Sequence, residues 1–263
     1  MPRSAPQCPT TRARSAPPCS ARSTTPPRAS SAPPSPRGRS SACRSPRSRA
    51  APPTPLRRFP PRYPGVVRIH ESADVDASAS IADGATIWHL AQVRDGATIG
   101  AECVVGRGAY IGSGVSIGAR SKVQNYALVY EPAVVEEGVF IGPGAVLTND
   151  TYPRAISPQG ELLGADDWHA VGVVLRRGAS IGARAVCVAP VEVGEWALVA
   201  AGSVVTTDVP AHALVAGSPA RIVGWVGKDA RRLHEEGDEL VSATTGERYR
   251  LRGGALTPVD GEQ

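Results

Sequence analysis

Residues 93–118 read VRDGATIGAECVVGRGAYIGSGVSIG, and an aliphatic residue stands at every sixth position of this stretch. The same spacing holds without a miss over residues 69–147 and resumes over residues 175–205, with a cysteine at one position. Four places after each aliphatic residue the side chain is usually small, as at Ala97 and Ala109. A helix repeats every 3.6 residues and an ordinary strand every 2, so a period of six fits neither.

A period of six is typical of a parallel β-helix, in which each hexapeptide forms one short strand and one corner. The aliphatic side chain points into a narrow prism, and the small residue fits inside the corner. Three hexapeptides complete one coil, so residues 18 apart stack at about 4.8 Å. No coil buries its apolar face alone, and stability comes from stacking. We therefore predict an all-β fold, a parallel β-helix of about seven coils over residues 66–209.

The repeat breaks once, at residues 148–174. Leu147 and Leu175 are 28 positions apart, which is not a multiple of six, so the break is an insertion and not a decayed repeat. A long loop inside a compact domain is usually functional or disordered. Because this one contains Asn, Asp, Tyr, Arg and Trp side chains, we predict a functional loop.

Residues 210–263 follow the last repeat and are predicted to form a small cap and tail. The end of a coil is an exposed sheet edge, which proteins usually cover. Within this segment Thr244-Thr245-Gly246 is a plausible turn of a hairpin between 240–242 and 249–251.

Residues 1–64 are rich in Pro, Arg, Ser and Ala, contain no acidic residue and show no apolar period, so we predict a disordered tail. A transit-peptide-like segment, an Arg-rich nucleic-acid contact and an extension translated from an upstream start are the alternatives. The tail carries 13 of the 29 basic residues, which leaves 16 basic against 24 acidic residues in the rest of the chain. That acidic body predicts no nucleic-acid partner.

The body has no apolar run of eighteen residues, so no membrane span is predicted. Cys103 and Cys187 fall at interior positions of the repeat and are interpreted as small core residues. A cytoplasmic location is the natural expectation for such a chain.

The 18-residue period groups polar residues into two columns. The first column contains His89, Arg107, Asn125 and Pro143, and the second contains Asp95, Ser113, Glu131 and Asn149. The corners with Trp88-His89, Gln124-Asn125-Tyr126 and Tyr130-Glu131 are more elaborate than a plain turn requires. A structural explanation stands beside a chemical one for each: His89 as a surface or subunit-contact residue, Asn125 as an asparagine ladder, and Glu131 as part of a solvated face.

Several motifs in the body occur in a characteristic order. They are Gln124-Asn125, Val129-Tyr130-Glu131, Phe140-Ile141-Gly142-Pro143, Thr148-Asn149-Asp150 with Tyr152-Pro153-Arg154, Asp167-Trp168, Arg177-Gly178-Ala179-Ser180-Ile181-Gly182, Ala201-Gly202-Ser203-Val204-Val205 and Gly217-Ser218-Pro219-Ala220-Arg221. Over residues 68–226 this set resembles the left-handed β-helix (hexapeptide-repeat) acyltransferases, and among them the N-acetyltransferases of nucleotide-linked 3-amino sugars. The hexapeptides alone occur in many acyltransferases, and the Gln-Asn block with the loop motif narrows the resemblance.

The resemblance implies a homotrimer that uses acetyl-CoA as co-substrate, binds no metal and acts in polysaccharide or glycan synthesis. The residues implied to contact CoA are Gly142, Gly182, Arg184, Ala200, Ala201 and Arg221. The residues implied to hold the nucleotide-linked amino sugar are Gln124, Glu131, Asn149, Tyr152 and Arg154. Asn125 would orient the amine, and His89 is the candidate base because its usual pKa lies near neutrality.

Three departures from the family pattern bear on the acceptor. Such enzymes usually have a second Asn where this chain has Tyr126, and often a second His where it has Gln92. Many also have Asn-Pro-Ala where this chain has residues 218–220 as Ser-Pro-Ala. The Tyr126 side chain is expected to reshape the sugar pocket.

Three other functions are weighed against this one. An O-acetyltransferase or another acyl-CoA acyltransferase, including one for amino acids, would use the same fold. A non-catalytic β-helix scaffold is the second alternative. A γ-class carbonic anhydrase-like metalloenzyme is the third, and it needs three converging His ligands, which the spacing around His89 does not supply.

Overall fold

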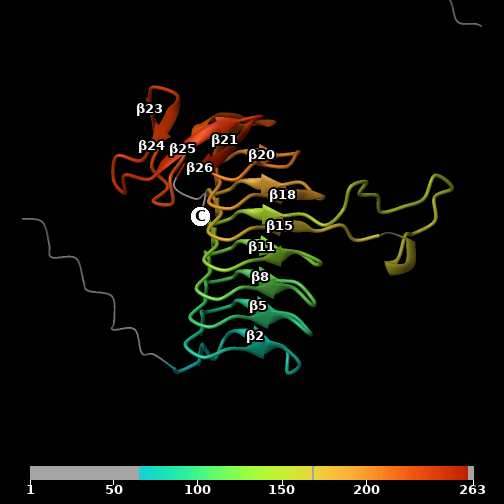
Figure 1. Cartoon of the computed structure of the whole chain (residues 1–263). Helices are drawn as coiled ribbons and strands as arrows, with labels where there is room; N and C mark the ends of the chain where they lie inside the picture. Colours follow the sequence, from blue (N-terminus) through green and yellow to red (C-terminus); the bar gives the residue numbers. More distant parts are fainter. Residues whose placement is uncertain (1–64, 168, 260–263) are drawn as a thin grey trace, which may run out of the picture. The chain divides into compact units, whose positions relative to one another are not determined.

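The structure of the chain is a computed structural model that describes residues 65–167 and 169–259. The predicted tail at residues 1–64 lies outside the described residues, as does Trp168. Within the described part the coils stack into a column of three parallel sheets (Figure 1). The parallel β-helix predicted from the period of six is confirmed.

From β1 to β20, each sheet takes every third strand of the chain. The first sheet contains β1 (Arg68–Ile69), β4 (Thr86–Ile87), β7 (Val104–Val105), β10 (Lys122–Val123), β13 (Phe140–Ile141), β16 (Ser180–Ile181), β19 (Leu198–Val199), β21 (Ala213–Gly217) and β22 (Ala220–Trp225). The second contains β2 (Asp74–Val75), β5 (Gln92–Val93), β8 (Tyr110–Ile111), β11 (Leu128–Val129), β14 (Val146–Leu147), β17 (Val186–Cys187) and β20 (Val204–Val205). The third contains β3 (Ser80–Ile81), β6 (Thr98–Ile99), β9 (Ser116–Ile117), β12 (Val134–Val135), β15 (Val173–Leu175) and β18 (Val191–Val193).

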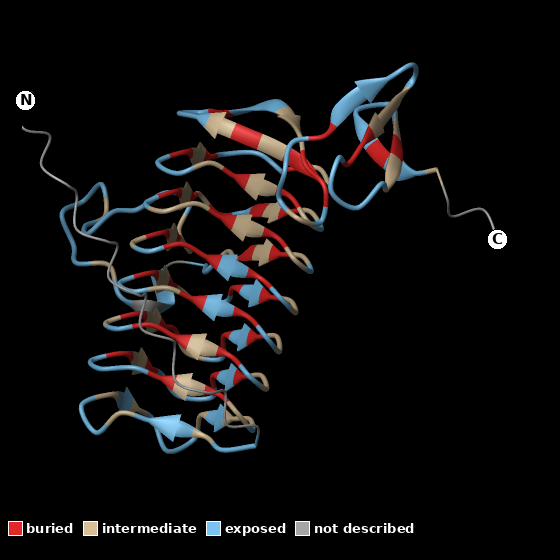
Figure 2. Cartoon of the chain, turned by 90° about the vertical axis from the view of Figure 1, so that its left-hand side faces the viewer, coloured by how far each residue is buried: buried red, intermediate tan, exposed pale blue. Residues whose placement is uncertain are grey.

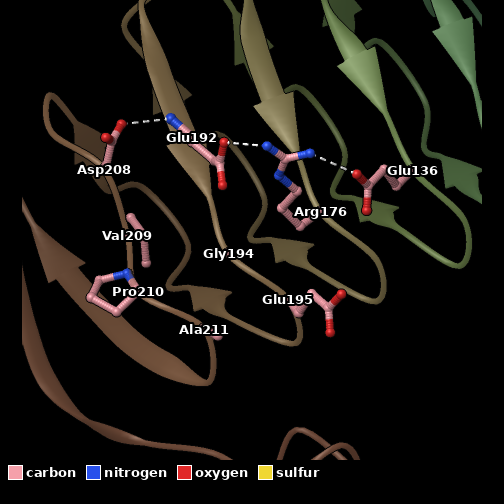
Figure 3. Close-up of a pocket in the computed structure, with 9 residues that line it drawn as sticks. All are labelled: Glu136, Arg176, Glu192, Gly194, Glu195, Asp208, Val209, Pro210 and Ala211. Carbon is pink, nitrogen blue, oxygen red and sulfur yellow. Dashed lines mark hydrogen bonds and ion pairs between the residues drawn. The ribbon is translucent and has the colours of Figure 1, made fainter. Parts of the chain in front are cut away.

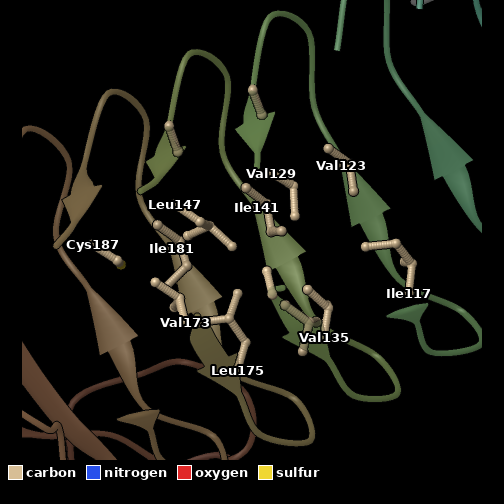
Figure 4. Packing of buried hydrophobic residues seen from close by; sticks show 14 of the residues in the cluster. Ile117, Val123, Val129, Val135, Ile141, Leu147, Val173, Leu175, Ile181 and Cys187 are labelled. Atoms are coloured by element: carbon tan, nitrogen blue, oxygen red, sulfur yellow. The ribbon is translucent and has the colours of Figure 1, made fainter. Parts of the chain in front are cut away.

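The register between coils follows the repeat. Val105 pairs with Val123 and Val123 with Ile141, each 18 positions on. The aliphatic residue of each pair points inward and is almost completely buried, whereas the neighbouring strand residue faces outward (Figures 2 and 4). The small residues are buried beside them. Cys103 and Cys187 are buried, free thiols, as predicted, and burial raises the pKa of Cys187 to about 12.

The column has about the predicted number of coils. Stacking extends slightly past residue 209, because Val209 bridges Val193 in parallel and Val215 pairs with Val199. At the opposite end the first coil has no coil beneath it among the described residues, and Ile69 is 47% exposed.

The insertion forms an arm that projects sideways from the column (Figure 1). The chain leaves after Leu147 and returns at β15, where Val135 pairs with Leu175, 40 positions on instead of 18. Strand β15 begins at Val173, which is buried and pairs with Val191, so the arm spans residues 148–172 and is two residues shorter than expected. Among its described residues, the arm contains the 3₁₀ helix η1 (Ala165–Asp167) and an antiparallel bridge between Ile156 and Leu162.

The C-terminal cap has two parts. Strands β21 and β22 form an antiparallel hairpin that extends the first sheet. A separate antiparallel sheet follows, with β23 (His234–Glu236), β24 (Glu239–Val241), β25 (Arg248–Arg252) and β26 (Ala255–Pro258). The predicted hairpin is confirmed, since β24 pairs with β25 in the register Leu240 to Tyr249.

The interior aliphatic residues should dominate stability. We predict that Ile141→Ala, which empties a fully buried position, lowers the free energy of unfolding by about 2–5 kcal/mol. The matched control is the neighbouring Phe140→Ala, because Phe140 is 38% exposed on the outer face. Chemical denaturation of both variants measures the difference, and an equal loss in both would contradict the inward and outward assignment.

The cap joins the column through a buried histidine. His212 donates from Nδ1 to the carbonyl of Val226 at 3.0 Å, and its ring lies 4.8 Å from that of Tyr249, between centroids. Burial lowers the pKa of His212, which also interacts with Lys228, Glu247 and Glu195. The neutral imidazole is therefore the form that fits this junction.

This histidine should make stability fall with acid. The unfolded chain binds a proton on His212 near pH 6.5, whereas the folded chain binds it only at lower pH, so stability is lost as the pH falls below about 6.5. His212→Asn removes the titration, and Asn tolerates the left-handed backbone there (φ 62°). Melting temperatures between pH 7.5 and 5 should fall less steeply for the variant. Parallel slopes would contradict this role of His212.

Candidate functional site

The three corners of each coil stack into three edges along the column. The first edge joins the first sheet to the second and contains residues 70–73, 88–91, 106–109, 124–127, 142–145, 182–185 and 200–203. The second edge joins the second sheet to the third and contains residues 76–79, 94–97, 112–115, 130–133, the arm, and residues 188–190 and 206–208. The predicted site residues divide between these two edges.

The first edge brings together both predicted catalytic residues, one predicted sugar contact and most of the predicted CoA contacts. The catalytic residues are His89 and Asn125, the sugar contact is Gln124, and the CoA contacts are Gly142, Gly182, Arg184, Ala200 and Ala201. Arg221 lies at the C-terminal end of the column, beyond Ala200 and Ala201. It pairs with Ala216, and the residue before Ala216, Val215, pairs with Val199 of the coil below. Residues far apart in the sequence therefore follow one line, with His89 near its start and Arg221 at its end.

The glycines on this line have a structural reason of their own. A Cβ on Gly142 would lie 2.6 Å from the backbone nitrogen of Ala183, and one on Gly182 would lie 2.4 Å from that of Ala201. Both distances are too short for a real contact, so the corners of successive coils touch through their backbones. Such a bare edge is also where a flexible arm of a ligand can approach the main chain closely.

Asn125 is tied into the column. Its Oδ1 accepts a hydrogen bond from the Arg107 N–H of the preceding coil at 2.9 Å, and a Cβ on Gly106 would lie 2.7 Å from that oxygen. The side chain thus makes a structural contact between coils, which is the asparagine-ladder explanation that the sequence had left open. This contact leaves the amide NH₂ and the second lone pair of the oxygen available to another group.

His89 lies apart from Asn125 within one chain. Its ring is exposed and stacks on His70 at 3.4 Å between centroids, and His70 in turn meets Ser72 at 2.9 Å. Two strand spacings separate His89 from Asn125, which is about 9–10 Å. An amine held by Asn125 cannot also contact the imidazole of the same chain, because general bases act at hydrogen-bond distance or through one water.

Tyr126 is the third residue of its corner and has a left-handed backbone (φ 59°). The equivalent residues in the neighbouring coils are Gly108 and Gly144, which also have positive φ. Its ring lies over Gly108, since a Cβ there would fall 2.6 Å from the Tyr126 ring. The ring is 56% exposed and therefore presents an aromatic surface between the coils of His89 and Asn125.

The second edge contains the remaining predicted substrate residues, Glu131, Asn149, Tyr152 and Arg154. Asn149 closes the base of the arm, because its carbonyl accepts from the Val171 N–H at 3.1 Å. Tyr152 and Arg154 lie further out, and the Tyr152 side chain is 85% exposed. Glu131 lies at the root of the arm beside Tyr110 and Tyr130, two aromatic residues that were not assigned a role from the sequence.

The Tyr110–Tyr130 pair could have been found from spacing alone. Tyr110 is the outward residue of β8 and Tyr130 follows β11 one coil later, so the register places them side by side. Their rings are 5.1 Å apart at 46°. Burial, and then the negative charge of Glu131, raise the pKa of Tyr110, which keeps its hydroxyl protonated.

The described surface has grooves near the C-terminal end of the column. A groove of about 470 Å³ is lined in part by the β21–β22 hairpin, and its lining includes Arg221, Val205 and Val215. A larger groove of about 580 Å³ lies along the third sheet and contains none of the predicted site residues (Figure 3).

The larger groove is held by an ion-pair ladder. Arg176 bonds Glu136 at 2.9 Å and Glu192 at 2.5 Å, and the Glu192 N–H donates to Asp208 at 2.8 Å. These contacts raise the pKa of Arg176. Because Arg176 is the first residue after β15, the ladder stabilises the coil at the point where the chain returns from the arm.

Residues 65–167 and 169–259 contain neither a cluster of metal-binding side chains nor a membrane-spanning helix. No three His, Cys, Asp or Glu side chains there lie close enough together to hold a metal ion. No helix in the same part of the chain is long and apolar enough to cross a membrane.

The fold and the repeat define a parallel β-helix protein built on hexapeptides, and two family profiles match it. Residues 78–113 match the bacterial transferase hexapeptide (six repeats), and residues 177–207 match the hexapeptide repeat of succinyl-transferase. These two segments are thus similar to hexapeptide-repeat transferases.

Two curated relatives are similar to part of the chain. A dTDP-3-amino-3,6-dideoxy-alpha-D-galactopyranose 3-N-acetyltransferase from Aneurinibacillus thermoaerophilus is 43% identical over 84 residues, which is 32% of this chain and 43% of the relative. A 2,3,4,5-tetrahydropyridine-2,6-dicarboxylate N-acetyltransferase from Staphylococcus aureus is 37% identical over 107 residues, 41% of this chain and 37% of the relative. The chain thus spans less than half the length of these relatives.

Among solved structures, a hexapeptide-repeat containing acetyltransferase from Vibrio cholerae complexed with acetyl coenzyme A is similar at a TM-score of 0.42. It is 24% identical, and the match covers 49% of this chain and 70% of that one.

Proposed function

We propose that this protein is an acetyl-CoA-dependent N-acetyltransferase that acts on the amino group of a nucleotide-linked amino sugar, with a 3-amino sugar as the first choice. The observation that carries the proposal is the line of residues along the first edge from Asn125 to Arg221. It places the bare corners of Gly142 and Gly182 beside one another and ends at an arginine, whose guanidinium suits phosphate. The partial relationship to a 3-amino-sugar N-acetyltransferase supports the same acceptor.

CoA would lie along this edge in the proposed complex. The pantetheine arm runs past Gly142, Gly182, Ala200 and Ala201, where no side chain beyond a methyl group obstructs the backbone. Arg184 and Arg221 meet the phosphates. The N–H groups of Gly142, Gly182 and Ala200 already donate to carbonyls of the next coil. In this proposal the Ala201 N–H is therefore the backbone donor that would stabilise the oxyanion on the thioester carbonyl.

The reaction needs a neutral amine that attacks the thioester carbonyl, after which the thiolate leaves and one proton is released. An amine is already a good nucleophile, so positioning supplies much of the acceleration. In this proposal the amide of Asn125 orients the acceptor. Direct proton transfer to His89 would require an amine bound nearer His89, or a water between them, because of the two coils that separate the two side chains.

The arm supports a proposed homotrimer. Its apolar side chains Tyr152, Ile156 and Leu162 are 85%, 53% and 82% exposed in the single chain. Exposed apolar surface on a projecting segment is typical of an interaction site. A neighbouring copy would cover it and bring Tyr152 and Arg154 to the substrate.

The second candidate is an N-acetyltransferase for an amino-acid-like acceptor, and one observation favours it: the similarity to a tetrahydropyridine-dicarboxylate N-acetyltransferase covers a longer part of this chain. An O-acetyltransferase and a scaffold are the remaining alternatives.

The function is tested by mixing the protein with acetyl-CoA and a panel of nucleotide-linked 3-amino and 4-amino sugars, and following release of free thiol. We expect turnover on at least one sugar, from a particle with the mass of a trimer. Acetyl-CoA binding with turnover only on an amino-acid acceptor would favour the second candidate. Failure to bind acetyl-CoA would favour the non-catalytic β-helix scaffold.

Two variants of Asn125 separate its structural role in the column from its proposed role in binding the acceptor. Asn125→Asp keeps an oxygen for the Arg107 N–H but loses the amide donors and introduces a charge that holds the amine as ammonium. We expect kcat/KM to fall roughly tenfold or more, the effect of about one hydrogen bond, with the melting temperature and CoA affinity nearly unchanged. Asn125→Ala should lower both stability and activity. Wild-type activity in Asn125→Asp would leave Asn125 a purely structural ladder.

A further inference from the structure

One coil lies between the two candidate catalytic residues of the first edge. Asn125 and His89 are two strand spacings apart, which is about 9–10 Å, and the residue between them in the same column is Arg107. A guanidinium group has donors and no acceptor, so Arg107 cannot pass a proton along the column. A proton from an amine held by Asn125 therefore needs another group in this gap before it can reach His89.

The ring of Tyr126 lies in this gap. A Cβ on Gly108 would lie 2.6 Å from Cε1 of Tyr126, 2.7 Å from its Cδ1 and 3.6 Å from its Cζ. Gly108 belongs to the coil between Asn125 and His89, so the ring leaves its own corner and lies level with the next coil. The direction of the ring carries its hydroxyl group from the corner of Asn125 toward the corner of His89.

Backbone hydrogen bonds fix the spacing of these three corners. The Tyr126 N–H donates to the Arg107 carbonyl at 2.9 Å, and the Gly108 N–H donates to the His89 carbonyl at 3.0 Å. Gly108 has a left-handed backbone (φ 61°) like Tyr126, and its missing side chain leaves the space that the ring occupies. The equivalent residue in the coil of His89 is Leu90, which has no polar side-chain atom to bind the hydroxyl instead.

The polar groups at both ends of this path are available. Within residues 65–167 and 169–259, neither the Tyr126 hydroxyl nor a ring nitrogen of His89 has a hydrogen-bond partner. The His89 ring stacks on His70 at 3.4 Å between centroids and lies nearly parallel to Trp88, at 9°. These contacts hold the plane of the imidazole and occupy neither nitrogen. Tyr126 is 56% exposed, so a substrate can reach its hydroxyl.

A phenol hydroxyl can accept one proton while it donates its own. When the amine attacks the thioester carbonyl, its nitrogen becomes a positively charged ammonium on the tetrahedral intermediate. One N–H proton then moves to the Tyr126 oxygen as the original hydroxyl proton moves to a ring nitrogen of His89. The phenol ends neutral, the imidazole gains the positive charge, and the intermediate expels the thiolate. Two hydrogen bonds of about 2.7–2.8 Å around one oxygen span about 5 Å of the gap.

We propose that Tyr126 is a catalytic residue that relays the amine proton from the acceptor to His89. This inference rests on the proposed function for the reaction and for the orientation of the amine by Asn125. It gives Tyr126 a role in the chemical step, in addition to the change in pocket shape that the sequence predicts.

The test is a double-mutant cycle in the full chain, on whichever acceptor the wild type acetylates. Tyr126→Phe removes the hydroxyl and keeps the ring over Gly108. We expect kcat to fall roughly tenfold or more, because a positioned proton-transfer group contributes at least that much. The KM values for both substrates and the melting temperature should stay near those of wild type. Because the two residues serve one proton path, His89→Gln and the double variant should be about as slow as Tyr126→Phe.

Tyr110→Phe is the matched control, since it removes the same hydroxyl from the outer face of the second sheet, and it should keep the kcat of wild type. Unchanged kcat in Tyr126→Phe would overturn the relay and indicate a path through water. Losses that multiply in the double variant would also overturn it, because the two residues would then act independently. A melting temperature that falls together with kcat in Tyr126→Phe would make the residue structural.

The outcomes separate this inference from the proposed function. If the wild type acetylates no acceptor, both proposals fail. Acetylation by wild type that is matched by Tyr126→Phe would overturn the relay alone and leave the proposed function in place.

Discussion

The stacking of coils at one strand spacing is the constraint on which the rest of the structure depends. Strands of two or three residues are too short to be stable alone, and each is held by the coils above and below. The column therefore requires an aliphatic side chain at every sixth position and little bulk at the corners. Gly142 and Gly182 show the cost of a deviation, because a single Cβ at either would overlap the backbone of the next coil.

The same constraint decides where chemistry can occur. The interior is filled with aliphatic side chains, so polar groups are restricted to the outer faces of the sheets and to the edges, where residues 18 apart become neighbours. At Gly106 and Gly112 a side-chain oxygen of the following coil lies where a Cβ of the glycine would stand. Asn125 uses that position to bond the column, and Glu131 occupies it with one oxygen left unpaired. Because the coils repeat, the paired oxygen of Asn125 on one edge can be compared directly with the unpaired oxygen of Glu131 on the next.

The arm and the cap are the two places where the repeat is interrupted, and both carry compensating contacts. Where the arm returns, Arg176 bonds carboxylates of the coils on either side and restores the register. At the end of the column, the hairpin covers the last coil and His212 packs on Tyr249 of the C-terminal sheet. Exposed ion pairs of this kind contribute modestly, so their main effect is on alignment.

The sequence by itself determined the coils, their number, the insertion and the columns, because a period of six is local and each repeat has the same environment. Counting in steps of eighteen also placed His89 and Asn125 in one column. The tertiary structure alone decided which side chains have partners: that Asn125 bonds a backbone N–H, that His89 stacks on His70, and that Glu131 keeps an unpaired oxygen. It also decided the length of the arm and the contact of His212. These depend on rotamers and on non-repeating segments, for which periodicity carries no information.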